Sequence, residues 1–141
     1  MLVGTYYHTL EAKGRFSLPK VFRQDTTAWV LTSGLDGCLY VFRQSDFDAQ
    51  VEKLAQLSYF QAKNRALVRH LAGNASPQIT DQLGRLTVPT QLIAYAALKK
   101  QIVVVGQLNH LEVWDAERYR EMMDRLEQTV EDAAEQVTLE E

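Results

Sequence analysis

Cysteine is almost absent from this chain of 141 residues, because Cys38 is the only one. A disulfide framework is therefore excluded, and a lone thiol is typical of proteins from a reducing compartment. Long apolar runs are also missing: residues 92–98 and 102–105 are the most apolar stretches, far shorter than the roughly 20 residues of a membrane helix. The N-terminus lacks the basic and apolar regions of a secretory signal. We therefore expect a cytoplasmic protein without a membrane partner.

Signatures of catalysis and metal binding are missing too. His8, His70 and His110 are scattered, without the spacing of a His-x-x-Glu-His motif or a Cys/His ligand set. There is no Gly-rich phosphate loop of the GxxxxGK type, and Cys38 falls in an expected hairpin turn, where an idle thiol is the simplest reading. We predict no catalytic residue, no metal site, no cofactor and no small-molecule substrate.

The chain as a whole has no excess of positive charge, but its N-terminal part does. Lys and Arg number 15 and Asp and Glu number 18, so the net charge of −3 gives no hint of a nucleic-acid partner. Residues 1–24, however, carry four basic residues against one acid, whereas residues 112–141 carry 11 acids against three arginines. The average therefore hides a basic front and an acidic tail.

One sequence motif occurs twice in the chain. Residues 11–19, EAKGRFSLP, align with residues 81–89, DQLGRLTVP, at an offset of 70. An acid, a glycine, an arginine, an apolar residue, a hydroxyl, an apolar residue and a proline recur in the same order. Further matches follow at an offset of 72, including residues 39–42 with residues 111–114. We interpret the chain as one continuous module used twice.

Each copy has the same predicted order of elements. A strand, at residues 5–10 or 78–80, leads into the acid-x-x-Gly-Arg turn, where glycine suits a positive φ. A short alternating strand follows, and Pro19 or Pro89 then opens a short helix. Two apolar strands come next, joined by a turn. They are expected at residues 29–31 and 39–42 in the first copy and at residues 102–105 and 111–114 in the second.

Helices are predicted after each copy. Ser45 offers an N-cap for the first, whose apolar stripe is Phe47, Val51, Leu54 and Leu57. A second helix, about residues 60–72, carries three basic residues and no acid; these form a solvated face by default, or else a subunit interface or added phosphate contact. They are Lys63, Arg65 and Arg69. The last helix begins near Asp115 and continues far towards the C-terminus. Its apolar positions are Tyr119, Met122, Leu126, Val130, Ala133 and Val137.

A half-module of a few short strands is marginal alone, so we expect the two copies to complete each other's sheet. The predicted fold is α+β, with two β modules that form a pseudo-two-fold barrel within one chain, flanked by helices. The predicted division is a first module with its helix at residues 1–57, a connecting basic helix at residues 58–76, and a second module with a long C-terminal helix at residues 77–141.

The paired acid-x-x-Gly-Arg loops, each followed by apolar-hydroxyl-apolar-Pro, resemble the AbrB-like swapped-hairpin DNA-binding domain. Two such copies in a chain of this length, with helices between and after them, resemble the MraZ family. The resemblance covers almost the whole chain. Its specific markers are Lys13-Gly14-Arg15, Gly84-Arg85, Val105-Gly106-Gln107 and Leu111-Glu112-Val113-Trp114-Asp115.

This resemblance implies a sequence-specific DNA-binding transcriptional regulator that associates with the nucleoid, with repression as the expected effect. It implies binding to short tandem DNA repeats upstream of the division and cell-wall gene cluster, including the regulator's own gene. It also implies a ring-shaped homo-oligomer. The DNA contacts carried over are Lys13, Gly14 and Arg15 in the first loop and Gly84 and Arg85 in the second.

The two loops depart from the family pattern in different ways. The usual acid of the first loop is Asp, and here it is Glu11, which can still pair with Arg15 but caps a turn less readily. In the second loop Gln82 and Leu83 leave Lys13 without a basic counterpart. We expect Glu11 and Asp81 to organise the loops through ion pairs with the arginines.

A basic cluster at a turn followed by a helix N-terminus suits phosphate contact, which adds Lys20 and Arg23 to the predicted DNA-binding residues. The aligned positions of the second copy are Thr90 and Ile93, so the first copy is predicted to carry more of the contact. Whether Arg15 reads guanine or only binds phosphate stays open.

Two other functions remain as alternatives. One is an antitoxin-like DNA-binding protein that also neutralises a partner toxin. Two modules and a tail with helical periodicity argue against it, because such antitoxins usually have one module and a disordered tail. The other is an assembly protein that only forms rings.

Overall fold

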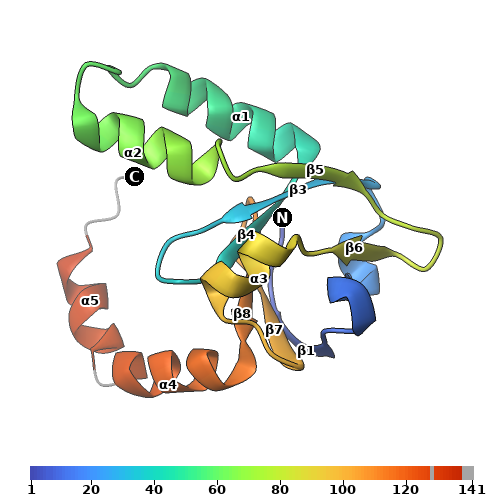
Figure 1. Cartoon of the computed structure of the whole chain (residues 1–141). Helices are drawn as coiled ribbons and strands as arrows, with labels where there is room; N and C mark the ends of the chain where they lie inside the picture. Colours follow the sequence, from blue (N-terminus) through green and yellow to red (C-terminus); the bar gives the residue numbers. More distant parts are fainter. Residues whose placement is uncertain (128, 138–141) are drawn as a thin grey trace.

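The computed structural model describes residues 1–127 and 129–137 (Figure 1). The first copy contains β1 (Thr5–Thr9), η1 (Ala12–Gly14), β2 (Arg15–Ser17), η2 (Lys20–Phe22), β3 (Ala28–Ser33), β4 (Leu39–Arg43) and α1 (Gln44–Ala55), where η1 and η2 are single 3₁₀ turns. Helix α2 (Ala62–Leu71) follows. The second copy contains β5 (Ser76–Ile79), β6 (Arg85–Thr87), α3 (Thr90–Ala96), β7 (Gln101–Gly106), β8 (Leu111–Asp115), α4 (Ala116–Glu127) and α5 (Val130–Gln136). The predicted α+β class is confirmed.

The two copies exchange their first strands. The large sheet has the order β1-β7-β8-β4-β3-β5, and all its neighbours are antiparallel. The first strand of each copy therefore pairs with the third strand of the other, β1 with β7 and β5 with β3. The second strands, β2 and β6, pair in a separate two-stranded sheet. This pairing confirms that each copy completes the sheet of the other.

No closed barrel is found among the described strands, and the predicted pseudo-two-fold barrel stays unconfirmed. Strands β1 and β5 form the two edges of the large sheet, which is open. One side chain links the two sheets: Gln78 Oε1 accepts a hydrogen bond from the Thr87 amide (2.9 Å), and its Nε2 donates to the Thr87 carbonyl (2.5 Å). The predicted division at residues 57 and 76 stays a prediction, and residues 138–141 of its last part lie outside the described residues.

The main core lies between the two sheets and draws on aligned positions of both copies. Phe16 and Leu86 on the small sheet are fully buried, as are Leu39 and Leu111 on the large one. Burial of these apolar side chains is the main driving force that holds the copies together. It explains why the short strands alternate between apolar and polar residues.

The helices differ from the prediction at two places. Helix α1 begins at Gln44, with Arg43 at the N-cap, so the predicted cap at Ser45 is wrong. Instead Arg43 Nε donates to Asp46 Oδ2 (2.5 Å), which leaves the serine inside the first turn. The predicted long C-terminal helix is described as two helices, α4, which ends at Glu127, and α5, which begins at Val130. Within the described residues, no helix combines the length and apolar character needed to cross a membrane.

Candidate nucleic-acid interface

The two Gly-Arg loops precede the paired strands β2 and β6, at opposite ends of this short antiparallel ladder, and an ion pair between Arg85 and Glu11 (3.2 Å) joins them. In the β2–β6 pair, Arg15 faces Thr87 and Ser17 faces Arg85. Both loops are closed by the same backbone hydrogen bonds: the acid's amide donates to the arginine carbonyl, and the glycine amide donates to the acid's carbonyl. We call residues 11–15 and 81–85, with the flanking Lys20 and Arg23, the paired-loop face.

Each loop glycine leaves room for a side chain of the other copy. Gly14 has φ +73° and Gly84 has φ +75°, a region that favours glycine. A Cβ at Gly14 would lie 3.0 Å from Ile93 Cδ1, and one at Gly84 would overlap the guanidinium of Arg23. Because Ile93 and Arg23 occupy aligned positions, each loop is covered by the same position of the other copy.

Asp81 closes the second loop. Its Oδ1 accepts hydrogen bonds from the amides of Leu83 and Arg85, both at 2.9 Å. Its Oδ2 accepts from Arg85 Nε at 2.8 Å. These donors, the Arg85 amide first, hold the pKa of the Asp81 carboxyl below its usual value.

Glu11 does not repeat this arrangement in the first loop. Its Oε1 lies 3.2 Å from Arg85 Nη1 of the other copy, and the expected ion pair between Glu11 and Arg15 is not among those of the described residues. A glutamate has one more methylene than an aspartate, so its carboxylate reaches past its own loop. Arg85 thus faces two carboxylates, and its pKa is raised chiefly by the hydrogen bond to Asp81.

The cations of the first copy differ from Arg85 in their exposure and in their lack of carboxylate partners. Lys13 and Lys20 are exposed, while Arg15 and Arg23 are half-buried. None of the four forms an ion pair with a described residue. The Nε atoms of Arg15 and Arg23 are buried without a hydrogen-bond partner in the part of the chain that the structure describes. Within the paired-loop face, the positive charge without a carboxylate partner among the described residues therefore belongs to the first copy.

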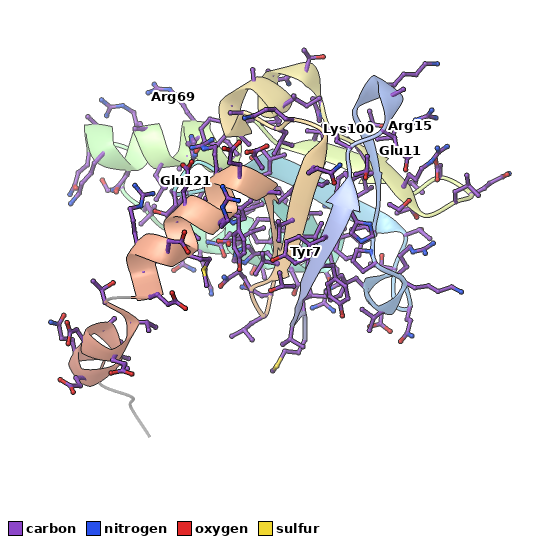
Figure 2. All side chains as sticks on the ribbon, turned by 90° about the horizontal axis from the view of Figure 1, so that it is seen from below. Tyr7, Glu11, Arg15, Arg69, Lys100 and Glu121 are labelled. Carbon is purple, nitrogen blue, oxygen red and sulfur yellow. The ribbon has the colours of Figure 1, made fainter. Side chains whose placement is uncertain are left out.

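Lys100 lies next to this face, a position that the sequence did not predict. The Leu10 amide donates to the Lys100 carbonyl at 2.8 Å, immediately before Glu11. Figure 2 shows Lys100 close to Glu11 and Arg15. The signal was the basic pair Lys99-Lys100 before a predicted strand, but only the pairing of β1 with β7 brings it to the loop.

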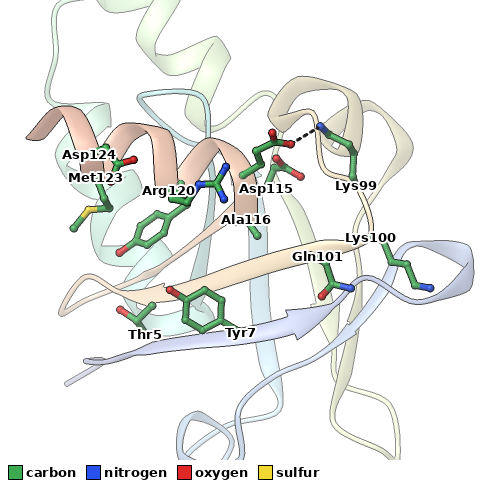
Figure 3. Close-up of a pocket in the computed structure, with 12 residues that line it drawn as sticks. Thr5, Tyr7, Lys99, Lys100, Gln101, Asp115, Ala116, Arg120, Met123 and Asp124 are labelled. Carbon is green, nitrogen blue, oxygen red and sulfur yellow. Dashed lines mark ion pairs between the residues drawn. The ribbon is translucent and has the colours of Figure 1, made fainter.

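A groove lies between β1, the start of β7 and α4 (Figure 3). Its volume is about 890 Å³, and exposed Tyr7 and Met123 line it beside charged side chains. The ion pair in it, from Lys99 to Glu117 (3.7 Å), is open to solvent. Across residues 1–127 and 129–137, no three His, Cys, Asp or Glu side chains are placed to hold a metal ion. Cys38 is buried, and its burial raises the pKa of the thiol.

The geometry defines a class of protein: a duplicated strand-exchanged module whose two Gly-Arg loops are joined by an ion pair. A family model described as "MraZ protein, putative antitoxin-like" matches residues 1–70 and again residues 71–140, which confirms the duplication.

Several relatives carry the name "Transcriptional regulator MraZ". The protein from Pediococcus pentosaceus is 38% identical over 136 residues, which cover 96% of this chain and 95% of that one. The protein from Saccharopolyspora erythraea is 36% identical over 138 residues, 97% of this chain and 96% of that one. The protein from Ligilactobacillus salivarius is 37% identical, with 96% and 95% covered. The chain belongs to the MraZ family.

Proposed function

We propose that the protein is a sequence-specific DNA-binding transcriptional regulator and that its paired-loop face contacts duplex DNA. The observation that carries this proposal is the set of cations in the first copy that have no carboxylate partner among the described residues. They are Lys13, Arg15, Lys20 and Arg23. Phosphates attract uncompensated cations, and this term supplies much of the affinity of DNA-binding proteins. The names of the relatives support the same function.

The residues of the face take different roles in this proposal. Exposed Lys13 and Lys20 bind phosphates, whereas half-buried Arg15, whose Nε is enclosed, offers the outer nitrogens of its guanidinium to phosphate or to a guanine edge. Gly14 and Gly84 set the tight turns of the two loops through their positive φ, and the space where a Cβ would lie is filled by Ile93 and Arg23 of the other copy. Arg85 contributes less, because two carboxylates already neutralise it. The first copy therefore makes most of the contact.

The proposed targets are short tandem repeats upstream of the division and cell-wall gene cluster, including the protein's own gene. Binding there represses transcription and places the protein on the nucleoid. We further propose a ring-shaped homo-oligomer that presents several first-copy loops to several repeats. Linked sites raise the overall affinity without new contacts, which compensates for a small basic footprint in each subunit.

Footprinting on the DNA upstream of the protein's own gene tests this proposal. The expected result is protection of short boxes at even spacing. Uniform coating of the fragment would contradict sequence-specific binding, and no protection at moderate salt would favour a protein that only assembles.

A further inference from the structure

The C-terminal helices carry apolar side chains that nothing in the described chain covers. Helix α4 packs Tyr119 and Met122 against Cys38, Val103 and Trp114. Other apolar residues of this region point to solvent, with exposed fractions between 43% and 60%. We call them the tail stripe: Met123, Leu126, Val130 and Val137.

Most of the charged residues around the tail stripe are acidic. Residues 121–136 contain six acids and one base, Arg125. Every described residue of α5 is exposed. An apolar stripe with charged neighbours is typical of a helix that docks against a partner.

A complementary surface lies at the corner between α1 and α2, which lie at the top of Figure 1, whereas α4 and α5 lie at the bottom. A groove of about 330 Å³ runs between these two helices. Its lining is mainly apolar, with arginines among the lining side chains. We call it the corner groove: Leu54, Leu57, Tyr59, Val68, Arg65 and Arg69. Residues 53–80 contain four basic residues and no acid.

The two copies differ in the hydrogen bonds that hold a C-terminal helix against the sheet. In the first copy, α2 returns to the sheet, where Thr32 Oγ1 donates to the Leu71 carbonyl (2.7 Å) and Ser33 Oγ to the His70 carbonyl (2.6 Å). The aligned positions of the second copy are Val104 and Val105, which have no hydroxyl. The second copy thus lacks the bonds that would hold a returning helix, and α5 stays away from the sheet.

We propose that the tail stripe of one molecule docks into the corner groove of a second copy of this chain. Amphipathic helices laid in apolar grooves are a common mode of recognition; here α4 carries Met123 and Leu126 and α5 begins with Val130. The arginines of the groove suit the acids of the tail. DNA has the charge to attract this groove but no apolar side chain to fill it. The contact is head-to-tail, so its repetition gives a closed ring or a filament.

This inference rests on the self-association that the proposed function includes, and it names the surfaces. Sedimentation velocity without DNA tests it with two variants at exposed or half-exposed positions. The tail variant is Met123→Ser/Leu126→Ser, and the corner variant is Leu57→Ser/Arg69→Glu. The matched control is Ile79→Ser, which removes an exposed apolar side chain from the edge strand β5.

The wild type and the control should sediment as the same assembly, and each variant alone as a monomer. An equimolar mixture of the two variants should form a dimer and stop there, because one intact tail meets one intact groove. Variants that assemble like the wild type, or a mixture that stays monomeric, would overturn the inference. A monomeric wild type would refute self-association itself, whereas DNA binding is judged separately by binding to a single repeat, which both variants should retain.

A covalent test does not depend on those variants. With Leu57→Cys/Leu126→Cys in one chain, mild oxidation should give disulfide-linked multimers on a non-reducing gel. The wild type should give none, since Cys38 is buried. A cross-linked monomer would show that the tail docks on its own molecule and would overturn the choice of a second copy.

Discussion

The guanidinium of Arg85 lies between two carboxylates from different copies of the module: Nη1 is 3.2 Å from Glu11 Oε1, and Nε is 2.8 Å from Asp81 Oδ2. Glu11 precedes Arg85 by 74 positions, so this pair joins the two loops as well as neutralising one of them. The asymmetry of charge across the paired-loop face follows from this contact, and it can be tested from either side.

Glu11→Gln removes one of the two carboxylates that face Arg85. The net charge of the face rises by one, so we expect tighter binding to duplex DNA of any sequence. If Arg85 then takes a phosphate, the slope of log affinity against log salt should steepen by about 0.9. Fluorescence anisotropy over a salt series measures both, with Glu52→Gln on α1 as the matched control. Unchanged affinity in Glu11→Gln would show that this carboxylate does not restrain DNA binding.

Arg15→Ala tests an arginine that forms no ion pair with a described residue. Loss of a bidentate contact to a base changes discrimination by roughly 1–3 kcal/mol, or about 5- to 150-fold. If Arg15 reads guanine, binding to the matched repeat should fall by such a factor while binding to a scrambled repeat falls less. Equal weakening on both DNAs would reject base reading and leave phosphate contact. The control is Arg125→Ala on α4, and unchanged binding in Arg15→Ala would remove this residue from the interface.

Gly84→Ala should destabilise the fold through Arg23. The positive φ alone costs a residue with a Cβ roughly 1–2 kcal/mol, and the added Cβ must also displace the guanidinium. Urea unfolding of Gly84→Ala with and without Arg23→Ala should therefore show a coupling of about 0.5 kcal/mol or more.

Gly14→Ala is the control for this cycle. Its Cβ would lie 2.9 Å from the backbone carbonyl oxygen of Val88, which cannot move aside as a side chain can. Arg23→Ala should give no rescue there. Additive effects in the Gly84 cycle would contradict the covering of this loop by Arg23.

The local parts of this fold, and the completion of each copy's sheet by the other, could be predicted from the sequence, but the individual strand pairs could not. Glycine, proline and alternation act on neighbouring residues, so the loops around Gly14 and Gly84 and the short strands after them were placed correctly. The partner of Glu11 depends on which strands pair, and neither periodicity nor spacing shows that β1 pairs with β7. The position of Lys100 beside the first loop was missed for the same reason. The cap at Ser45 was wrong because a serine pattern cannot show that Arg43 and Asp46 bind each other.

His110 makes the stability depend on pH. Its ring packs against Tyr40 and Phe42, with centroid distances of 4.3 and 5.1 Å, and burial lowers its pKa. The unfolded chain then binds a proton more readily, so stability should fall as the pH drops through about 6.5 and level off below the folded pKa. Urea unfolding between about pH 7.5 and 5.5 should show a shallower slope for His110→Gln. His8→Gln is the companion variant, since burial lowers that pKa too, and an unchanged slope in His110→Gln would contradict the assignment.

A footprint titration of the wild type against Lys13→Ala/Arg15→Ala, on the DNA upstream of the protein's own gene, is the most direct test of the paired-loop face. The wild type should protect evenly spaced boxes. The double variant should leave them unprotected while keeping the thermal unfolding and sedimentation of the wild type. Protection of the same boxes at the same protein concentration by the double variant would contradict DNA binding through the first loop.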